Sequence, residues 1–199
     1  MSNYPKDIYP ESRNRLPTPQ REELDDLGKR IYDETTGASP LNIAGLQGPG
    51  GIWLHNPPLA ERHRALNHAV RSSKELGPTL TELAILVTAR AVSHQFEWTV
   101  HEPVARAKGL SAKAIDIVKH RLPIEGLTEQ ESTIIRLGRE ALEDRKLSSQ
   151  TYADAERLFG RPGLVALTAL MAGYASTAVM LTVFDQQLPA DKPPLLPLP

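Results

Sequence analysis

The sequence predicts an all-α fold, a bundle of about eight helices. Alanine and leucine dominate the apolar residues of the 199-residue chain and aromatic residues make up only 5%, a composition that favours helices over strands. Apolar residues recur at helical spacing, and no segment alternates apolar and polar residues as a half-buried strand does. Capping residues and helix breakers punctuate the apolar segments, so each expected helix has a start and a stop.

Two helix starts are predicted by a capping residue before proline, at Thr18–Pro19 and at Asn56–Pro57. The first helix is expected to end near Gly37 and the second near Gly77, because glycine commonly follows a helix. Four glycines within residues 45–51 mark the loop between these two helices.

Capping-box spacing predicts two further starts. Thr79 with Glu82 and Thr128 with Glu131 each place a glutamate three residues after a threonine. The helices that follow these boxes are expected to reach about Val92 and about Lys146. Two more helices are expected between them, over 94–109 and 111–121.

Two helices separated by a break are expected in the C-terminal part. Helix 149–159 is closed by Gly160, and Pro162 opens a last helix that runs to about Gln186. Proline-rich chain beyond it is expected to be extended. The predicted organisation is an N-terminal extended arm, one helical domain and a Pro-rich C-terminal tail: residues 1–17, 18–186 and 187–199.

The segment Gly163–Phe184 has no charged residue and is long enough to span a bilayer. It is also rich in alanine, glycine, serine and threonine, stands alone, and is not followed by a basic cluster. We therefore interpret it as a helix buried on most sides, and we expect no membrane partner.

Composition excludes several classes of function. A formal net charge of −1 argues against a nucleic-acid partner. Cysteine is absent, which excludes a disulfide framework, a thiolate nucleophile and a redox dithiol. The N-terminal residues contain no apolar stretch of the kind found in secretory signals, so a cytoplasmic location is expected.

The candidate catalytic residues are Glu82, Glu97 and His101. Glu97 and His101 share one helix face, so His101 is the candidate general acid or base and Glu97 the group that orients its ring. The alternative is an exposed ion pair of little consequence. Glu82 has apolar neighbours three, four and seven residues later, which predicts a buried carboxyl group with a raised pKa. A capping box would account for Glu82 equally well.

His94 lies seven residues before His101 on the same stripe. Seven helical residues rise about 10 Å, which is too far for the two imidazoles to share one metal ion easily. We predict no metal and no other cofactor, and expect His94 to form a pocket wall or to act as a secondary proton carrier.

Substrate-binding candidates come from the glycine-containing loop and from the arginines. The loop lacks the lysine and the serine or threonine of a phosphate-binding loop, although its backbone N–H groups suit an anionic oxygen. A plain connector is the alternative reading of this loop. Arg90, with Arg62 or Arg106, is a candidate anchor for a substrate carboxylate or else a solvated surface charge. The loop candidates are Gly50, Gly51, Trp53 and His55.

The chain from Trp53 to Leu188 resembles the carboxymuconolactone decarboxylase family, which shares its fold with the AhpD-like alkylhydroperoxidases. The resemblance rests on the segments ELAILVTARAVSHQFEW, EWTVHEPVARAKGLS and FGRPGLVALTALMAGYASTAVML. The peroxidase motif is Glu, eleven residues, Cys, two residues, Cys, three residues, His. It falls here on Glu82, His94, Glu97 and His101, so both cysteines are replaced.

This resemblance implies the branch of the family that lacks the peroxidase cysteines. The resemblance implies that the protein is a cofactor-independent lyase that decarboxylates a small anionic lactone or unsaturated acid in aromatic compound catabolism. It also implies that the protein forms a homo-oligomer, either a trimer or a hexamer. One alternative is an isomerase or ring-opening enzyme that uses the same Glu/His site. The other is a non-catalytic relative of the peroxidases that has lost both cysteines.

Overall fold

The computed structural model describes residues 4–39, 42–189 and 191–197. These residues contain eight α-helices and no strand, so the predicted all-α fold is confirmed. Residues 1–3, 190, 198 and 199 of the predicted arm and tail, and 40–41 of the predicted loop, lie outside the described residues. The α-helices are α1 (Asp26–Thr36), α2 (Pro49–Trp53), α3 (Pro57–Arg71), α4 (Gly77–Ala91), α5 (Gln95–Ala107), α6 (Ala112–Lys119), α7 (Glu129–Gly138) and α8 (Ser149–Val183), with a 3₁₀ turn η1 (Arg21–Glu23) and a π-helical turn η2 (Arg139–Asp144).

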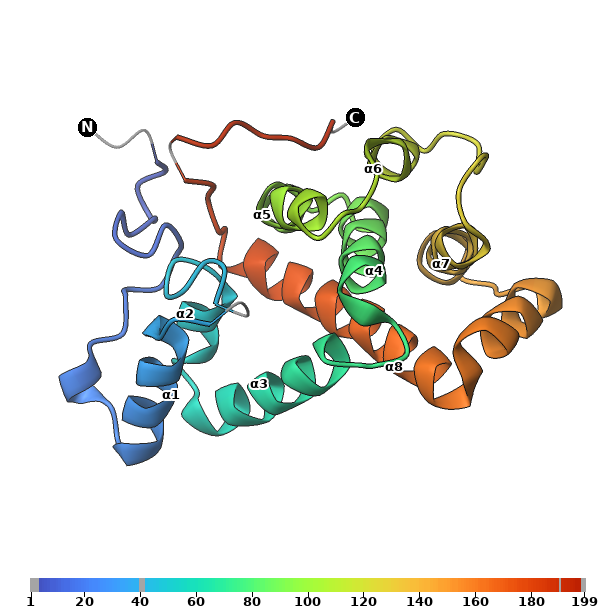
Figure 1. Ribbon diagram of the computed structural model, residues 1–199. Coiled ribbons are helices and arrows are strands. Elements are labelled where there is room, and N and C mark those ends of the chain that lie inside the picture. The colour runs from blue at the N-terminus through green and yellow to red at the C-terminus, as the bar shows by residue number, and fades with distance from the viewer. Residues whose placement is uncertain (1–3, 40–41, 190, 198–199) are drawn as a thin grey trace. The chain divides into compact units, whose positions relative to one another are not determined.

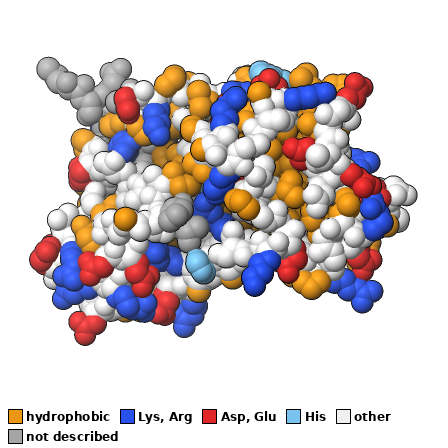
Figure 2. Space-filling model, in the orientation of Figure 1, with side chains coloured by type: hydrophobic (Ala, Val, Ile, Leu, Met, Phe, Trp, Pro, Cys, Tyr) orange, Lys and Arg blue, Asp and Glu red, His pale blue; other side chains and the backbone are white. Residues whose placement is uncertain are grey.

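The chain divides into two compact units. The first unit contains residues 1–68 and 179–193, and the second contains residues 69–178 and 194–199. Lysine, arginine and acidic side chains are interspersed on the face shown in Figure 2.

Helix α4 is central to the second unit. Nine consecutive residues, Thr81–Ala89, are buried, because α5, α6 and α7 all pack against this helix (Figure 1). Gly138, at the end of α7, lets the two backbones approach: a Cβ atom there would lie 2.1 Å from Val87 Cγ1. Glu82 therefore projects from the buried part of a helix that three other helices hold in place.

The C-terminal tail is docked on α5 within the second unit. The Gln95 side chain accepts a hydrogen bond from Leu196 N at 2.9 Å and donates one to Leu196 O at 3.3 Å. Leu195 N donates to Thr99 Oγ1 at 3.3 Å, and the Leu196 side chain is buried in the core. The tail is extended as predicted, and these contacts hold it against the outer face of α5.

Helix α8 is kinked where the sequence predicts a break. Gly160 has φ 65° and ψ 171°, a conformation that glycine adopts without strain, and Pro162 follows it. Leu167 and Leu170 lie in the core, whereas Val165 is exposed. Within the described residues this is the one helix long and apolar enough to cross a membrane, and one third of its most apolar window is buried. The prediction that this helix is buried on most sides is therefore wrong, because most of its apolar window is not buried. A single helix of this kind is weak evidence for a membrane span.

The predicted first helix start is wrong. Thr18–Pro19 precedes only the 3₁₀ turn, and α1 begins after Asp25, whose carboxylate accepts a hydrogen bond from Gly28 N at 2.7 Å. An aspartate at the N-cap satisfies an otherwise unpaired N–H group and explains the later start. Conversely, the Asn56–Pro57 start is confirmed by α3.

The two predicted capping boxes have different outcomes. Thr128 and Glu131 form the reciprocal pair of hydrogen bonds at the start of α7, as predicted. Helix α4 instead begins at Gly77, and the Thr79 hydroxyl donates to Lys108 O at 2.6 Å. Glu82 is therefore not a capping residue, and its carboxylate is available for other contacts.

In the first unit, the described part of the N-terminal arm is bound to the segment after α8. Arg15 N donates to Phe184 O at 2.9 Å, and Asn14 Nδ2 donates to Gln186 Oε1 at 3.0 Å. Asn14 and Gln186 are both buried. The arm and this segment therefore stabilise each other.

Candidate functional site

The second unit brings the predicted catalytic residues Glu82 and His101 into direct contact. Glu82 lies on α4 and His101 on α5, and the His101 Nδ1 atom is 2.8 Å from Glu82 Oε2. Glu82 is fully buried and His101 is 4% exposed. A carboxylate at this distance fixes both the orientation of the imidazole and the ring nitrogen that carries its proton.

Two cationic side chains approach the other oxygen of Glu82. Lys108 Nζ donates to Glu82 Oε1 at 2.7 Å, and Arg71 Nη2 donates to the same atom at 3.4 Å. Burial alone would raise the pKa of Glu82, but hydrogen bonds and charges from His101 and Lys108 outweigh it and lower the pKa to about 2. The predicted burial of Glu82 is confirmed, and the predicted raised pKa is wrong: this group is a carboxylate at neutral pH.

Glu97 lies on the opposite side of the imidazole. Its Oε2 atom is 3.6 Å from His101 Nε2, beyond the length of a hydrogen bond, and its side chain is buried. Burial raises the pKa of Glu97 to about 7, although the charges of His101 and Arg71 act in the other direction. The orienting contact to His101 therefore comes from Glu82, and Glu97 is a carboxyl group that gains or loses a proton near neutrality.

Tyr174 and His94 border these residues. The Tyr174 ring meets the His101 ring edge-on, with the centroids 5.2 Å apart, and burial raises the pKa of the phenol, so it stays neutral. His94 is the N-cap of α5, where its Nδ1 accepts a hydrogen bond from Glu97 N at 3.3 Å. Burial lowers the pKa of His94 to about 4. A neutral capping histidine holds the first turn of α5, which carries Glu97.

The loop candidates belong to the first unit, where each has a local partner. Trp53 stacks on His63 with ring centroids 4.4 Å apart, and His55 Nε2 lies 3.0 Å from Pro17 O. Gly50 and Gly51 lie in the first turn of the short helix α2, and a Cβ atom on Gly51 would lie 2.1 Å from Leu46 O. These contacts show why the glycines fit there, and the substrate-binding role of the loop stays a prediction.

Arg90 does not join Glu82 and His101. It lies eight residues after Glu82 on α4, which is a rise of about 12 Å along the helix. Arg121 Nη2 donates to Arg90 O at 3.4 Å, and Arg121 also pairs with Glu143. Arg90 is thus part of a separate cluster at the end of α4.

Sequence reasoning missed Arg71, Lys108 and Tyr174. A signal existed for Lys108, which lies seven residues after His101 and therefore on the same stripe of α5 and its C-cap. Arg71 and Tyr174 come from α3 and α8, and no spacing along the sequence relates them to the site. Their position depends on how helices pack.

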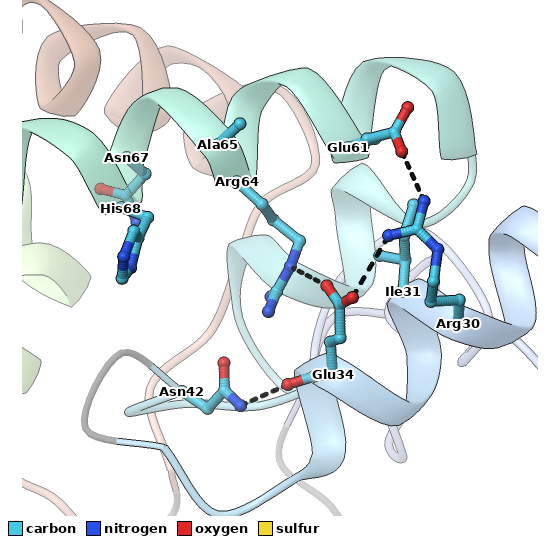
Figure 3. Close-up of a pocket in the computed structure, with 9 residues that line it drawn as sticks. All are labelled: Arg30, Ile31, Glu34, Asn42, Glu61, Arg64, Ala65, Asn67 and His68. Carbon is cyan, nitrogen blue, oxygen red and sulfur yellow. Dashed lines mark hydrogen bonds and ion pairs between the residues drawn. The ribbon is translucent and has the colours of Figure 1, made fainter.

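A pocket of about 450 Å³ lies in the first unit between α1 and α3 (Figure 3). Its charged residues pair with one another: Arg30 contacts Glu34 and Glu61, and Arg64 contacts Glu34. None of the candidate site residues lines it. The described residues also contain no group of three or more histidine, aspartate or glutamate side chains arranged to hold a metal ion, and the predicted independence from metal stays a prediction.

The helical arrangement is that of the AhpD core. A crystal structure described as the AhpD core of an uncharacterized peroxidase-related protein from Ralstonia eutropha JMP134 matches with a TM-score of 0.69 and 15% identity, covering 90% of this chain and 94% of that one. The debrominase Bmp8, in complex with 2,3,4-tribromopyrrole, matches with a TM-score of 0.64 and 14% identity, covering 87% and 90%. At these identities the likeness shows the fold.

Residues 57–135 match the model of the carboxymuconolactone decarboxylase family, so the predicted resemblance to that family is confirmed. This segment contains Arg71, Glu82, Glu97, His101 and Lys108. The absence of cysteine agrees with the branch that lacks the peroxidase pair. No curated protein matches the chain.

Proposed function

We propose that the protein is a cofactor-independent lyase similar to carboxymuconolactone decarboxylase, which removes carbon dioxide from a small anionic lactone or unsaturated acid by proton transfer. The observation that carries the proposal is the buried chain Glu82–His101–Glu97. One end is an ionised carboxylate bound to the imidazole, and the other end is a carboxyl group whose pKa is about 7. A proton donor that titrates near the working pH is what carbanion protonation requires.

Decarboxylation needs an acid that protonates the carbanion left behind. The C–C bond to the carboxylate breaks, carbon dioxide leaves, and the bonding electrons are delocalised through the unsaturated ring onto the carbonyl oxygen as an enolate. Glu97 then gives its proton to a carbon of this enolate and forms the new C–H bond. Solvent restores the proton to Glu97 by way of His101, whose ring the Glu82 carboxylate holds in place.

These roles revise the expectation from the sequence. The sequence predicts His101 as the general acid or base and Glu97 as the group that orients its ring. The contacts favour Glu82 as the orienting group, since it lies 2.8 Å from the imidazole whereas Glu97 lies 3.6 Å away. We assign proton donation to Glu97 and proton relay to His101. The debrominase neighbour, which binds a small heterocycle, supports a small ring as substrate.

The test is turnover of 4-carboxymuconolactone in D₂O, with carbon dioxide release and deuterium incorporation both measured. The wild type is expected to release one carbon dioxide and to place one deuterium on the product per turnover. Glu97→Gln should lower the rate on the order of 10²–10⁴-fold, and Glu125→Gln, at an exposed glutamate, should leave it unchanged. Substrate consumption without carbon dioxide release would favour the isomerase or ring-opening alternative. No turnover of any carboxylated lactone would favour the non-catalytic alternative.

A further inference from the structure

Glu82 has its charge compensated without Arg71. Its Oε2 atom is bonded to His101 at 2.8 Å and its Oε1 atom to Lys108 at 2.7 Å, both at ordinary hydrogen-bond lengths. Arg71 reaches Oε1 only at 3.4 Å. Arg71 is therefore an additional cation beside an acid that already has two partners.

Arg71 is also buried with unused hydrogen-bonding capacity. Its side chain is 4% exposed, and its Nε atom is buried and has no hydrogen-bond partner in the part of the chain that the structure describes. A guanidinium group carries five N–H donors, and a buried donor without an acceptor costs free energy. An acceptor that fits the planar guanidinium, such as a carboxylate, would remove this cost.

The charges around Arg71 favour an anion at this place. Lys108 and Arg71 carry two positive charges, against one negative charge on Glu82. Glu97 adds a second negative charge only when it is ionised. While Glu97 holds its proton, the site has an excess of positive charge that a bound carboxylate would neutralise.

We propose that Arg71, the last residue of α3, binds a carboxylate of the substrate that the reaction retains. The carboxylate that leaves becomes neutral carbon dioxide, so a cation bound to it would stabilise the ground state more than the transition state and would slow the reaction. A retained carboxylate keeps its charge throughout, and holding it positions the ring beside Glu97. The assignment of a reacting and a retained carboxylate depends on the proposed lyase function, whereas carboxylate binding by Arg71 does not.

The experiment measures equilibrium binding by calorimetry with two matched probes, 5-oxotetrahydrofuran-2-acetate, whose carboxylate lies off the ring as the retained one does, and its neutral methyl ester. The wild type is expected to bind the carboxylate about ten- to a hundredfold more tightly than the ester, the usual effect of one charge-assisted hydrogen-bonded pair. Arg71→Gln should reduce this preference to about twofold or less. Arg71→Lys keeps the charge but lacks the planar fork, and should retain an intermediate preference.

The control is Arg161→Gln, which removes an arginine of α8 whose side chain is exposed and paired with Glu156, and it should leave the preference unchanged. The proposal is overturned if the wild type binds both probes equally, if Arg71→Gln keeps the preference, or if Arg161→Gln abolishes it. If Arg71→Gln does not fold, Arg71→Lys is compared with the wild type. An equal preference for the carboxylate over the ester in both proteins would contradict a contact between the planar guanidinium and the carboxylate. Carbon dioxide release is not part of this measurement, so failure of the lyase function and failure of the Arg71 assignment are distinguishable.

Discussion

The substitution Glu97→Gln should make the protein more stable at alkaline pH although it strongly lowers the proposed activity. Burial holds the pKa of Glu97 at about 7, above the ordinary value of 4.5. Above pH 7 the group is ionised in both the folded and the unfolded chain, and the folded state bears the full cost of burying the charge. Below pH 4.5 it is protonated in both states and this cost disappears. Stability from this group is therefore lost as the pH rises from 4.5 to 7.

The magnitude follows from the size of the pKa change. Each pKa unit corresponds to about 1.4 kcal/mol, so a rise from 4.5 to about 7 corresponds to a cost on the order of 3 kcal/mol above pH 7. Glutamine has nearly the same shape and no charge. Glu97→Gln should therefore raise the free energy of unfolding by about this amount at pH 8.5 and change it little at pH 4.5.

The assay is guanidinium unfolding of wild type and variant at both pH values and at one fixed protein concentration. Comparing the two proteins at each pH cancels the titration of all other groups. Glu125→Gln, at an exposed position, serves as the control and should stay within about 0.5 kcal/mol of the wild type at both pH values.

Glu82→Gln should behave in the opposite way. The pKa of Glu82 is lowered to about 2 by His101 and Lys108 against the effect of burial, so its stabilising contribution is present above pH 4.5 and is lost as the pH falls toward 2. Removing the carboxylate should destabilise the protein at pH 8.5. The reasoning about the site is refuted if Glu97→Gln is no more stable than the wild type at pH 8.5. It is also refuted if the gain at pH 4.5 equals that at pH 8.5, because a packing effect would not depend on pH.

Four further outcomes are expected. His101→Gln should lower turnover on the order of 10²–10⁴-fold with a smaller change in substrate affinity, and turnover within a few-fold of the wild type would remove the relay role. No thiol peroxidase activity is expected with dithiol reductants, because the chain has no cysteine, and peroxide turnover above a blank would contradict this. Sedimentation at micromolar concentration should detect a trimer or hexamer, since apolar residues of α8 such as Val165 are exposed, whereas a monomer would count against oligomerisation. Gln95→Ala should lower stability by about 1–3 kcal/mol and release the C-terminal tail to proteolysis, because the Leu196 backbone would lose both hydrogen bonds; a tail that stays protected would show that the Leu196 side chain and the Leu195–Thr99 hydrogen bond suffice to hold it.

The sequence was most informative where a structure depends on residues close together in the chain. Capping at Thr128–Glu131, the break at Gly160 and the helix that starts at Asn56–Pro57 are local features, and each is present. The Thr79–Glu82 box failed because two distant residues, Lys108 and His101, offer these side chains other partners. Local preference is weak compared with such tertiary contacts.

The sequence by itself determined the helical class, the burial of the Glu82 face of α4, and the presence of Glu82 and His101 at the spacing of the family motif, with Glu97 in place of a cysteine. Only the tertiary structure decided what each of these groups does. Glu82 and Glu97 are both buried glutamates, yet one has a pKa of about 2 and the other a pKa of about 7. The difference arises because Lys108 and His101 bond directly to Glu82, whereas Glu97 is buried and no cation among the described residues is hydrogen-bonded to it. Protonation depends on partners that folding brings together, and spacing along the chain does not specify them.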